Sequence, residues 1–488
     1  MKLILDGKIN KTYVQTLCMA FFHGEKFPED EKDATTVLYV RTEDREGGIY
    51  CEAELCTPDG KEHATSFVPF SCSKSYERIS KTAVGKAVYE VASKLTGRSL
   101  PWGILTGIRP SKVAADLIKA EGEEHASAIL KNEYLLSDKK IHLVTDVAKN
   151  EKKIISLAKD KTCSVYISIP FCPSRCNYCS FISYATPKLF SLIPEYLNRL
   201  TLDIKDTFKT IKSLGLKVLC VYIGGGTPTI LDENQLDKLL SCIENCIDTK
   251  ELLEFTLEGG RPDTITVEKL RIAKSHGVNR ISVNPQSLND LVLEKIGRKH
   301  TVSDFLRAYE TVEKSGIEHI NTDLIAGLDG DTKESFQNTV DKIISLSPGN
   351  VTVHTLCVKN AAEIRKGERK IYQASGDIAG ASVDYAYDRL TGSGYAPYYL
   401  YRQKNTVSDL ENVGYSKPGE EGLYNVFMMA DAHSVFGVGA GSTTKLVSAK
   451  DGKTQIKRIF SPKYPYEYLQ DNRKGCKETE NFKKEAEK

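Results

Sequence analysis

The chain has 488 residues, of which 40% are hydrophobic and 27% are charged, a composition typical of a globular protein of roughly two to four domains. Because 67 basic residues nearly balance 65 acidic ones, the formal net charge of +2 gives no support for a nucleic-acid or membrane surface. The sequence has neither a signal-peptide-like start nor an apolar run of about eighteen residues, and its thirteen cysteines then predict a reducing cytoplasm, where thiols stay free or bind metal.

Residues 1–160 are predicted to form a separate α+β domain. Alternating apolar residues and a glycine turn predict strands over Val37–Arg41, Ile49–Leu55 and His63–Val68. Apolar residues at helical spacing predict helices over Ser75–Leu95 and Pro110–Ala120. The sequence indicates no role for this domain.

A cysteine-rich loop directly follows the next predicted strand. That strand covers Val165–Ile169, whose β-branched residues favour it, and Pro170 ends it. Cys172, Cys176 and Cys179 follow in the spacing Cys-x3-Cys-x2-Cys. Three thiolates this close together suit three irons of a [4Fe–4S] cluster and leave the fourth iron open to a small molecule.

Three other interpretations of these cysteines compete with a cluster. A zinc ion would need a fourth ligand, and neither a second Cys-x-x-Cys pair nor a histidine pair lies nearby. Disulfide bonds would need an oxidising compartment, and three cysteines cannot all pair. Buried structural cysteines are common one at a time but rarely come three in such a short stretch. The sequence therefore favours a cluster.

From residue 161 to residue 391 the chain alternates between strands and helices. Strands are predicted over Val165–Ile169, Val218–Ile223, Glu254–Leu257, Arg280–Asn284, His319–Leu324 and Val351–Thr355. Helices are predicted between them, over Pro194–Ser213, Glu233–Cys246, Thr266–His276, Ser303–Ser315 and Thr332–Ile344. Such units predict an α/β fold with parallel strands and right-handed crossovers, a partial (β/α)6 barrel rather than a closed barrel of eight.

Polar or glycine-rich residues follow the ends of these strands, where chemistry gathers in barrels. The second strand leads into Gly224–Thr229, where missing side chains let the backbone approach a ligand closely. Glu258 follows the third strand, Asn284–Ser287 ends the fourth, and Asp323 lies in the fifth. Glu258 or Asp323 alone could form a strand-end salt bridge, but together they favour a functional site.

Beyond residue 391 the alternation stops, and residues 392–488 are predicted to cover the barrel or contact substrate. The segment Tyr395–Asn405 is rich in tyrosine and ends in cations. It could pack against a flat macrocycle and pair with its carboxylates, or it could be an amphipathic strand that covers an open barrel edge. His300 and His354 lie near the predicted barrel mouth and are candidate substrate contacts.

The cysteine loop carries a family resemblance. Its spacing after a first strand, with Tyr178 before the last cysteine, is similar to the radical S-adenosylmethionine (SAM) superfamily, whose open iron chelates SAM. The stretch Tyr-Ile-Ser-Ile-Pro-Phe-Cys resembles the oxygen-independent coproporphyrinogen III oxidase (dehydrogenase) family and its haem-chaperone relatives. Glu411–Tyr415, Gly437–Gly441 and an N-terminal Thr-Gly-Ile-Arg-Pro resemble the Z-type branch of that family.

The resemblance implies roles for individual residues of the radical SAM barrel. Cys172, Cys176 and Cys179 would hold the [4Fe–4S] cluster. Residues that match contacts to the cluster-bound SAM are Tyr166, Gly225 and Glu258. Tyr178 matches the aromatic before the third cysteine. Residues that match contacts to a second SAM are Gly226, Thr227, Gln286, Arg298 and Asp323. Arg298 suits such a contact because a guanidinium can hold a carboxylate with two parallel hydrogen bonds.

The resemblance also implies an enzyme of porphyrin and haem biosynthesis. The reduced cluster would cleave SAM to a radical that takes a hydrogen atom from the β-carbon of a propionate. Loss of carbon dioxide and one electron would leave a vinyl group, and two such reactions would convert coproporphyrinogen III to protoporphyrinogen IX. The partners implied are a tetrapyrrole substrate and an electron donor such as flavodoxin or ferredoxin, under low-oxygen conditions.

Two departures from the family keep a second function open. Ser168 stands where the family has histidine, and Phe181 stands where well-characterised oxidases have a fourth cysteine, so that Cys-Ser-Phe resembles the Cys-Asp-Phe of the chaperones. The alternative is a haem-binding chaperone that keeps the cluster and the SAM site without dehydrogenase activity. Another radical SAM tetrapyrrole enzyme, such as a methylase or a haem-opening enzyme, is a third class, because one fold hosts many chemistries.

Overall fold

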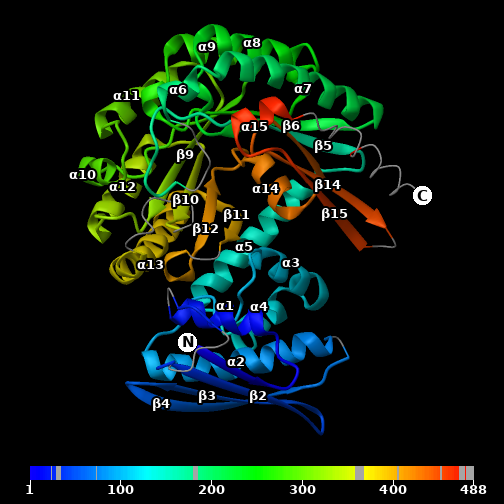
Figure 1. Cartoon of the computed structure of the whole chain (residues 1–488), viewed down its shortest axis with the longest axis vertical. Coiled ribbons are helices and arrows are strands. Elements are labelled where there is room, and N and C mark those ends of the chain that lie inside the picture. Colours follow the sequence, from blue (N-terminus) through cyan, green and yellow to red (C-terminus); the bar gives the residue numbers. More distant parts are fainter. Residues whose placement is uncertain are drawn as a thin grey trace. The chain divides into compact units, whose positions relative to one another are not determined.

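The chain folds into two compact units (Figure 1). The computed structural model describes residues 1–22, 25–28, 34–72, 74–179, 185–357, 368–403, 406–450, 453–471 and 479. The first unit comprises Met1–Ala148, Gly367–Asp377 and Leu400–Glu411, and the second comprises Lys149–Lys366, Ile378–Tyr399 and Asn412–Lys488. This division differs from the predicted boundaries after residues 160 and 391, because the chain returns to the first unit late in the sequence.

A four-stranded sheet forms the core of the first unit. Its strands lie in the order β1-β2-β3-β4, with β1 parallel to β2 and the other neighbours antiparallel. Along β3, Ile49, Cys51, Ala53 and Leu55 are buried and alternate with more exposed residues, so one face of the sheet is covered. The strands are β1 (Lys2–Asp6), β2 (Val37–Arg45), β3 (Gly48–Thr57) and β4 (Gly60–Pro69).

Helices α1 and α2 supply the other side of this core. Leu17 of α1 and Val84 of α2 are buried among the same hydrophobic residues as the covered sheet face. Ser75 caps α2 by accepting a hydrogen bond from the Arg78 backbone N–H, and Gly97, with a φ of 63°, ends it. The helices are α1 (Lys11–Phe21), α2 (Tyr76–Thr96), α3 (Pro110–Glu121), α4 (Glu123–Asn132) and α5 (Asp138–Ile155). The predicted strands and both predicted helices are confirmed.

A buried ion pair holds residue 411 within the first unit. The Glu411 side chain has 0% exposure and the Lys140 side chain 5%. Lys140 Nζ donates to Glu411 Oε1 at 2.6 Å, and Trp102 Nε1 donates to Oε2 at 2.7 Å. Burial alone would raise the pKa of Glu411, but the attraction of Lys140 and these hydrogen bonds hold that pKa below its ordinary value. The Glu411 carboxylate is therefore charged, and its contacts with Lys140 and Trp102 compensate for the cost of burying that charge.

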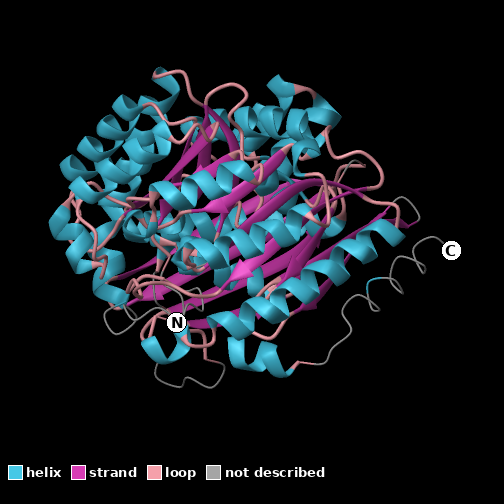
Figure 2. Cartoon of the chain, turned by 90° about the horizontal axis from the view of Figure 1, so that it is seen from above, coloured by secondary structure: helices cyan, strands magenta, loops and turns pink. Residues whose placement is uncertain are grey.

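A large, mostly parallel sheet forms the core of the second unit (Figure 2). Its strand order is β11-β12-β10-β9-β8-β7-β6-β5-β13-β14-β15. The central strands from β5 to β10 all run parallel to their neighbours, which confirms the six predicted strands. They are β5 (Thr162–Ile169), β6 (Lys217–Gly225), β7 (Glu254–Glu258), β8 (Arg280–Ser282), β9 (His319–Ala326) and β10 (Asn350–Thr355).

Strands from the C-terminal part of the chain extend both edges of this parallel sheet. At one edge β13 (Ser434–Val438) pairs in parallel with β5, and β14 (Thr443–Lys450) and β15 (Lys453–Phe460) continue antiparallel. At the other edge β12 (Glu411–Ser416) pairs antiparallel with β10, and β11 (Ala396–Arg402) is the outermost strand.

The tyrosine-rich segment is thus a strand at the sheet edge, as one of its two interpretations predicted. The Tyr398 hydroxyl accepts a hydrogen bond from Asn350 Nδ2 at 2.8 Å, and the Tyr395 hydroxyl donates to the Pro348 carbonyl at 2.6 Å. Both tyrosines are buried. Their aromatic rings therefore pack within the protein at the edge of the sheet. Residues 404–405 of the segment lie outside the described residues.

The helices that follow the parallel strands begin at polar capping residues. Asp232, Thr266, Thr301 and Thr332 each accept a hydrogen bond from the backbone N–H three residues later. The helices of the second unit after α5 are α6 (Pro187–Phe190), α7 (Ile193–Ser213), α8 (Glu233–Glu244), α9 (Val267–Ser275), α10 (Asp290–Lys295), α11 (Val302–Lys314), α12 (Lys333–Leu346), α14 (Leu423–Ala430) and α15 (Pro465–Gln470). Two helices, α5 and α13 (Glu368–Gly392), belong in part to each unit.

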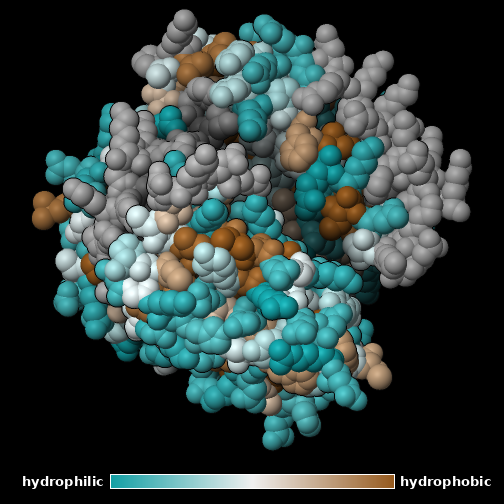
Figure 3. Space-filling model, turned by 60° about the horizontal axis from the view of Figure 1, so that its bottom comes forward, coloured by the Kyte–Doolittle hydropathy of each residue, from teal (hydrophilic) through white to brown (hydrophobic). Residues whose placement is uncertain are grey.

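The face shown in Figure 3 is covered mostly by hydrophilic side chains, with hydrophobic ones interspersed among them. Within the described part of the chain, the helices are all too short or too polar to pass through a bilayer.

Removing one partner of the buried ion pair is expected to destabilise the first unit. Lys140→Met leaves the Glu411 carboxylate buried without its cation, and such changes cost about 3–5 kcal/mol. Trp102 is the sole tryptophan of the chain and contacts Glu411 directly, so its fluorescence during urea unfolding reports on this unit.

The matched control is Lys131→Met. Lys131 pairs with Asp138 in the same unit, but both side chains are more than half exposed, so a loss of at most about 1 kcal/mol is expected. Equal free energies of unfolding for the two variants would contradict a compensating role for Lys140.

Candidate active site

The cysteine loop lies at the carboxyl end of β5. Cys176 is buried, and Cys172 and Cys179 are half-buried. The backbone N–H of Asn177 donates to the Ile296 carbonyl at 3.1 Å, and its side chain donates to the Lys295 carbonyl at 2.9 Å. The loop is therefore fixed against the end of α10.

No three His, Cys, Asp or Glu side chains within the described residues come together as ligands of one metal ion. A single zinc ion would need such a convergence, because all of its ligands bind the same atom. The thiolates of an iron–sulfur cluster bind different irons, so they need only surround a common space.

The glycine run after β6 packs directly against the cysteine loop. Gly226 N donates to the Ile169 carbonyl at 2.8 Å, and Thr227 N donates to the Phe171 carbonyl at 2.7 Å. A Cβ at position 226 would lie 2.5 Å from the Phe171 oxygen, so glycine is required there. The Thr227 hydroxyl donates to Cys172 Sγ at 3.4 Å. The predicted residues Gly226 and Thr227 thus contact the cysteine loop itself.

Glu258 ends β7, and its carboxylate contacts residues of the neighbouring strand β6. The Tyr222 hydroxyl donates to Glu258 Oε1 at 2.5 Å, and a Cβ at position 224 would lie 2.6 Å from Oε2. Burial raises the pKa of Glu258 to about 7, and the Asp323 carboxylate acts in the same direction. The hydrogen bonds from Tyr222 and from the Gly225 backbone oppose this rise.

Three tyrosines stack inside the barrel beside Glu258. The ring centroids of Tyr166 and Tyr222 are 6.0 Å apart, and those of Tyr222 and Tyr424 are 4.6 Å apart. Tyr166 was predicted from the sequence, whereas Tyr222 and Tyr424 were not. The pairing register could have indicated Tyr222, because it lies directly opposite Tyr166 on the neighbouring strand.

Tyr424 reaches the barrel because a buried ion pair holds the chain just before it. Arg280 and Glu254 pair at 3.4 Å, and their side chains are 3% and 2% exposed. Arg280 donates to the carbonyls of Glu420 and Glu421 at 3.1 and 2.9 Å, and Glu254 accepts from the Leu423 backbone N–H at 2.6 Å.

Arg298 joins the cysteine loop to the ends of β7 and β8. Its Nη1 donates to the carbonyls of Gly260 and Asn284 at 3.2 and 2.8 Å, and its Nη2 donates to the Tyr178 hydroxyl at 3.2 Å. Arg298 is 8% exposed. The structure therefore places the predicted residues Arg298 and Tyr178 in direct contact.

Gln286 and Asp323 also lie together. Gln286 N donates to the Asp323 carbonyl at 3.1 Å, and Asn284 Nδ2 donates to Asp323 Oδ2 at 2.8 Å. Gln286 has a φ of 68°, an uncommon conformation for a residue other than glycine. His354 Nε2 lies 3.8 Å from Asp323 Oδ2, which places this candidate substrate contact in the same group.

His300 is buried near Arg298 and Arg261. Burial and the two neighbouring cations lower its pKa to about 4, so the imidazole is neutral at pH 7. Within the described part of the chain, both ring nitrogens lack a hydrogen-bond partner, as do Gln286 Oε1 and Arg298 Nε. Buried polar atoms without partners are rare in folded proteins.

These residues fit a [4Fe–4S] cluster with SAM beside it. A cluster held by three thiolates is negatively charged, and two buried arginines lie next to its predicted ligands. The glycine run brings its own backbone against the cysteine loop, and unpartnered polar atoms of Gln286, Arg298 and His300 remain available.

Of the two departures from the family pattern, Ser168 is described by the structure and Phe181 is not. The Ser168 hydroxyl donates to the Ala440 carbonyl at 2.7 Å, and the Ala440 N–H donates to the Tyr196 hydroxyl at 2.9 Å. Ser168 therefore connects β5 to Ala440, which lies just after β13. Phe181 lies outside the described residues.

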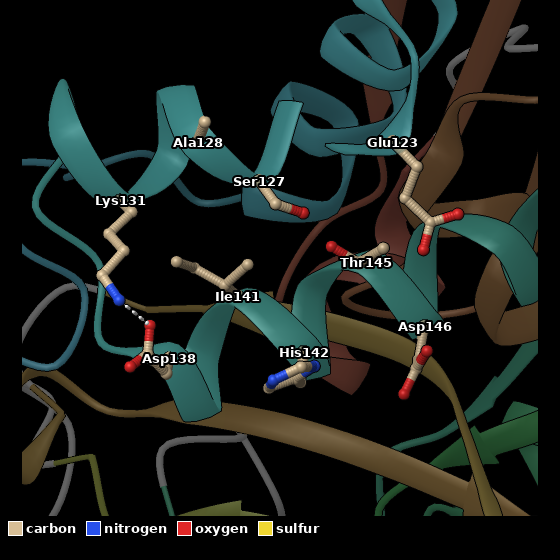
Figure 4. Close-up of a pocket in the computed structure, with 9 residues that line it drawn as sticks. All are labelled: Glu123, Ser127, Ala128, Lys131, Asp138, Ile141, His142, Thr145 and Asp146. Carbon is tan, nitrogen blue, oxygen red and sulfur yellow. Dashed lines mark hydrogen bonds and ion pairs between the residues drawn. The ribbon is translucent and has the colours of Figure 1, made fainter. Parts of the chain in front are cut away.

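The first unit contains a pocket of about 290 Å³ between α4 and α5 (Figure 4). An ion pair of 2.8 Å between Lys131 Nζ and Asp138 Oδ1 lies at its rim. The residues that line it are Glu123, Ser127, Ala128, Lys131, Asp138, Ile141, His142, Thr145 and Asp146. None of the predicted site residues is among them.

Comparison with known proteins agrees with the fold. Residues 166–343 match the radical SAM superfamily. The chain is 35% identical over 413 residues to the oxygen-independent coproporphyrinogen-III oxidase-like protein HemZ of Bacillus subtilis, covering 84% of this chain and 82% of HemZ. It is 31% identical over 313 residues to the haem chaperone HemW of the same organism, covering 62% of this chain and 77% of HemW.

Among solved structures, the coproporphyrinogen III oxidase HemN of Escherichia coli has a similar fold. The TM-score is 0.50 at 20% identity, covering 65% of this chain and 71% of that chain. At this identity the likeness shows the fold alone.

The barrel, the cysteine loop and the superfamily match define a radical SAM protein, a class that uses a [4Fe–4S] cluster and SAM. Within that class, the extent of the similarity to HemZ shows the particular group. The chain belongs to the family of oxygen-independent coproporphyrinogen-III oxidase-like proteins.

Glu258 is expected to make the stability of the second unit depend on pH. Its folded-state pKa of about 7 lies above its ordinary value of 4.5, so the folded protein keeps a proton that the unfolded chain releases. The free energy of unfolding therefore falls as pH rises from 4.5 to 7, by about 3 kcal/mol from this group.

Glu258→Gln removes this contribution, so its stability relative to the wild type should increase across that pH range and then level off. Urea unfolding followed by circular dichroism at a series of pH values measures the difference. Glu268→Gln, at an exposed position, is the control. A pH-independent difference between Glu258→Gln and the wild type would contradict the raised pKa.

Proposed function

We propose that the protein is an oxygen-independent coproporphyrinogen III dehydrogenase that converts two propionates of its substrate to vinyl groups. The observation that carries this proposal is the grouping of the cysteine loop, Glu258 and the Arg298–Tyr178 pair at the carboxyl ends of neighbouring parallel strands. The similarity to HemZ over most of both chains supports it. We further propose that the protein works in the cytoplasm, given its many cysteines.

In this proposal Cys172, Cys176 and Cys179 bind three irons of the cluster. The hydrogen bond from Thr227 to Cys172 and the backbone bonds of the glycine run hold the loop in one conformation. When bound, the cluster and SAM supply a one-electron reduction that yields a carbon radical able to remove hydrogen from a propionate β-carbon.

The residues around the cluster are proposed to bind and orient SAM. The Gly225 backbone would contact the amino acid part of SAM, and Glu258 would accept hydrogen bonds from its ribose hydroxyls. Tyr222 supports this role, because its hydrogen bond fixes the Glu258 carboxylate. Gln286, Arg298 and Asp323 are proposed to contact a second SAM.

A haem chaperone is the second candidate function. The similarity to HemW favours it, and Ser168 keeps it open, because its hydroxyl is committed to the Ala440 carbonyl where the family has a titratable histidine. The electron donor, flavodoxin or ferredoxin, would be needed for the dehydrogenase reaction and not for haem delivery.

Anaerobic turnover distinguishes the two functions. Protein reconstituted with iron and sulfide is incubated with coproporphyrinogen III, SAM and dithionite, and the porphyrins are separated after oxidation. We expect products with one and two vinyl groups. Deoxyadenosine without vinyl products, together with tight binding and transfer of haem, would favour the chaperone instead.

Substitution of the cysteines tests the cluster site. Cys176→Ala is expected to lose the iron, the visible absorbance of the cluster and all vinyl product, because one iron loses its thiolate. Cys72→Ala, at an exposed cysteine of the first unit, should keep about four irons per chain. Full iron content in Cys176→Ala would contradict the assignment of this ligand.

A further inference from the structure

A buried arginine that was not among the predicted site residues donates a hydrogen bond to one of the three cysteines. Arg261 Nη1 lies 3.7 Å from Cys176 Sγ. Arg261 is 3% exposed and Cys176 is 8% exposed. Charged side chains are rarely this buried unless a partner compensates the cost of removing them from water.

Asp263 fixes the direction in which the guanidinium points. Arg261 Nε donates to Asp263 Oδ1 at 3.1 Å, and Nη2 donates to Oδ2 at 3.4 Å. This two-point contact leaves Nη1 directed at Cys176. The Asp263 side chain is 30% exposed, so water screens its charge more than that of the arginine. The charge of the guanidinium, which contacts the sulfur directly, is therefore less screened than that of the carboxylate.

The backbone around Arg261 is equally constrained. Gly259 cannot carry a Cβ, which would lie 2.5 Å from the Ser282 carbonyl, and Gly260 has a φ of 54°. The Thr264 hydroxyl donates to the Arg261 carbonyl at 2.8 Å. These contacts hold Arg261 beside the cysteine loop before any ligand binds.

We propose that Arg261 raises the reduction potential of the [4Fe–4S] cluster by acting through Cys176. The proposal rests on the proposed binding of the cluster by that cysteine. Reduction takes the cluster from the 2+ to the 1+ state with one electron, and no bond breaks. The added negative charge strengthens both the N–H···S hydrogen bond and the attraction to the guanidinium, so Arg261 favours the reduced form.

Arg261 is thus a positioning residue that acts on the cluster and not on the substrate. Its neighbour Arg298 donates to two backbone carbonyls and to the Tyr178 hydroxyl. Thr227 donates to Cys172, but its hydroxyl is neutral. Of these three donors, Arg261 combines a full charge with direct contact to a sulfur.

A redox titration followed by electron paramagnetic resonance tests the proposal. Full-length protein is reconstituted anaerobically and titrated with dithionite in the absence of SAM. Arg261→Gln removes the charge and keeps a side-chain N–H, and we expect a lower midpoint potential. A tenfold loss in the equilibrium constant for one-electron reduction corresponds to about 59 mV.

Asp263→Asn provides a test of opposite sign. It removes a negative charge, and its amide oxygen can still accept from Arg261, so the midpoint potential should rise. Arg271→Gln is the matched control, because Arg271 pairs with Glu268 at the surface with 68% of its side chain exposed. Its potential should equal that of the wild type.

Arg261→Gln protein with full iron content and an unchanged potential would overturn the proposal. If that variant fails to fold, an unchanged or lower potential in Asp263→Asn overturns it instead. Wild-type protein that binds no four-iron cluster would overturn the proposed function as well, so the two failures are distinguishable by iron content.

Discussion

The site depends on the close approach of two backbones, the cysteine loop after β5 and the glycine run after β6. Two backbone hydrogen bonds of 2.8 and 2.7 Å join them, and they leave no space for a side chain at position 226. The same run brings the Thr227 hydroxyl to Cys172 and the Gly225 N–H to Glu258. Cysteines, glycines and carboxylate therefore share one rigid support, as a preorganised site requires.

Charge is distributed unevenly around this support. On the side of the cysteine loop, Arg261 contacts Cys176 and Arg298 contacts Tyr178. In the barrel interior, the Asp323 carboxylate raises the cost of ionising Glu258, and Tyr222 supplies the compensating hydrogen bond. A negatively charged cluster and a SAM molecule with both positive and hydroxyl groups would meet complementary partners on the two sides.

The C-terminal part of the chain completes the second unit. The Arg280–Glu254 pair binds the backbone before α14 and so places Tyr424 on Tyr222. Ser168 binds the backbone after β13. The C-terminal segments around Tyr424 and Ala440 thus pack beside Glu258 and the strand that precedes the cysteine loop. They therefore contribute to the proposed site although they are distant from it in sequence.

The sequence by itself determined the parallel strands, their helices and the cysteine spacing, because periodicity, capping and short motifs are local properties of a chain. It placed Gly225 and Glu258 at strand ends, and the family resemblance singled out Arg298, but Tyr222, Tyr424 and Arg261 were left unassigned. Those residues acquire their contacts through strand register and through the return of distant segments, and the same is true of β13 beside β5 and of Glu411 beside Lys140. Only the tertiary structure decided these pairings, because pairing energy between distant segments depends on packing that no local pattern encodes.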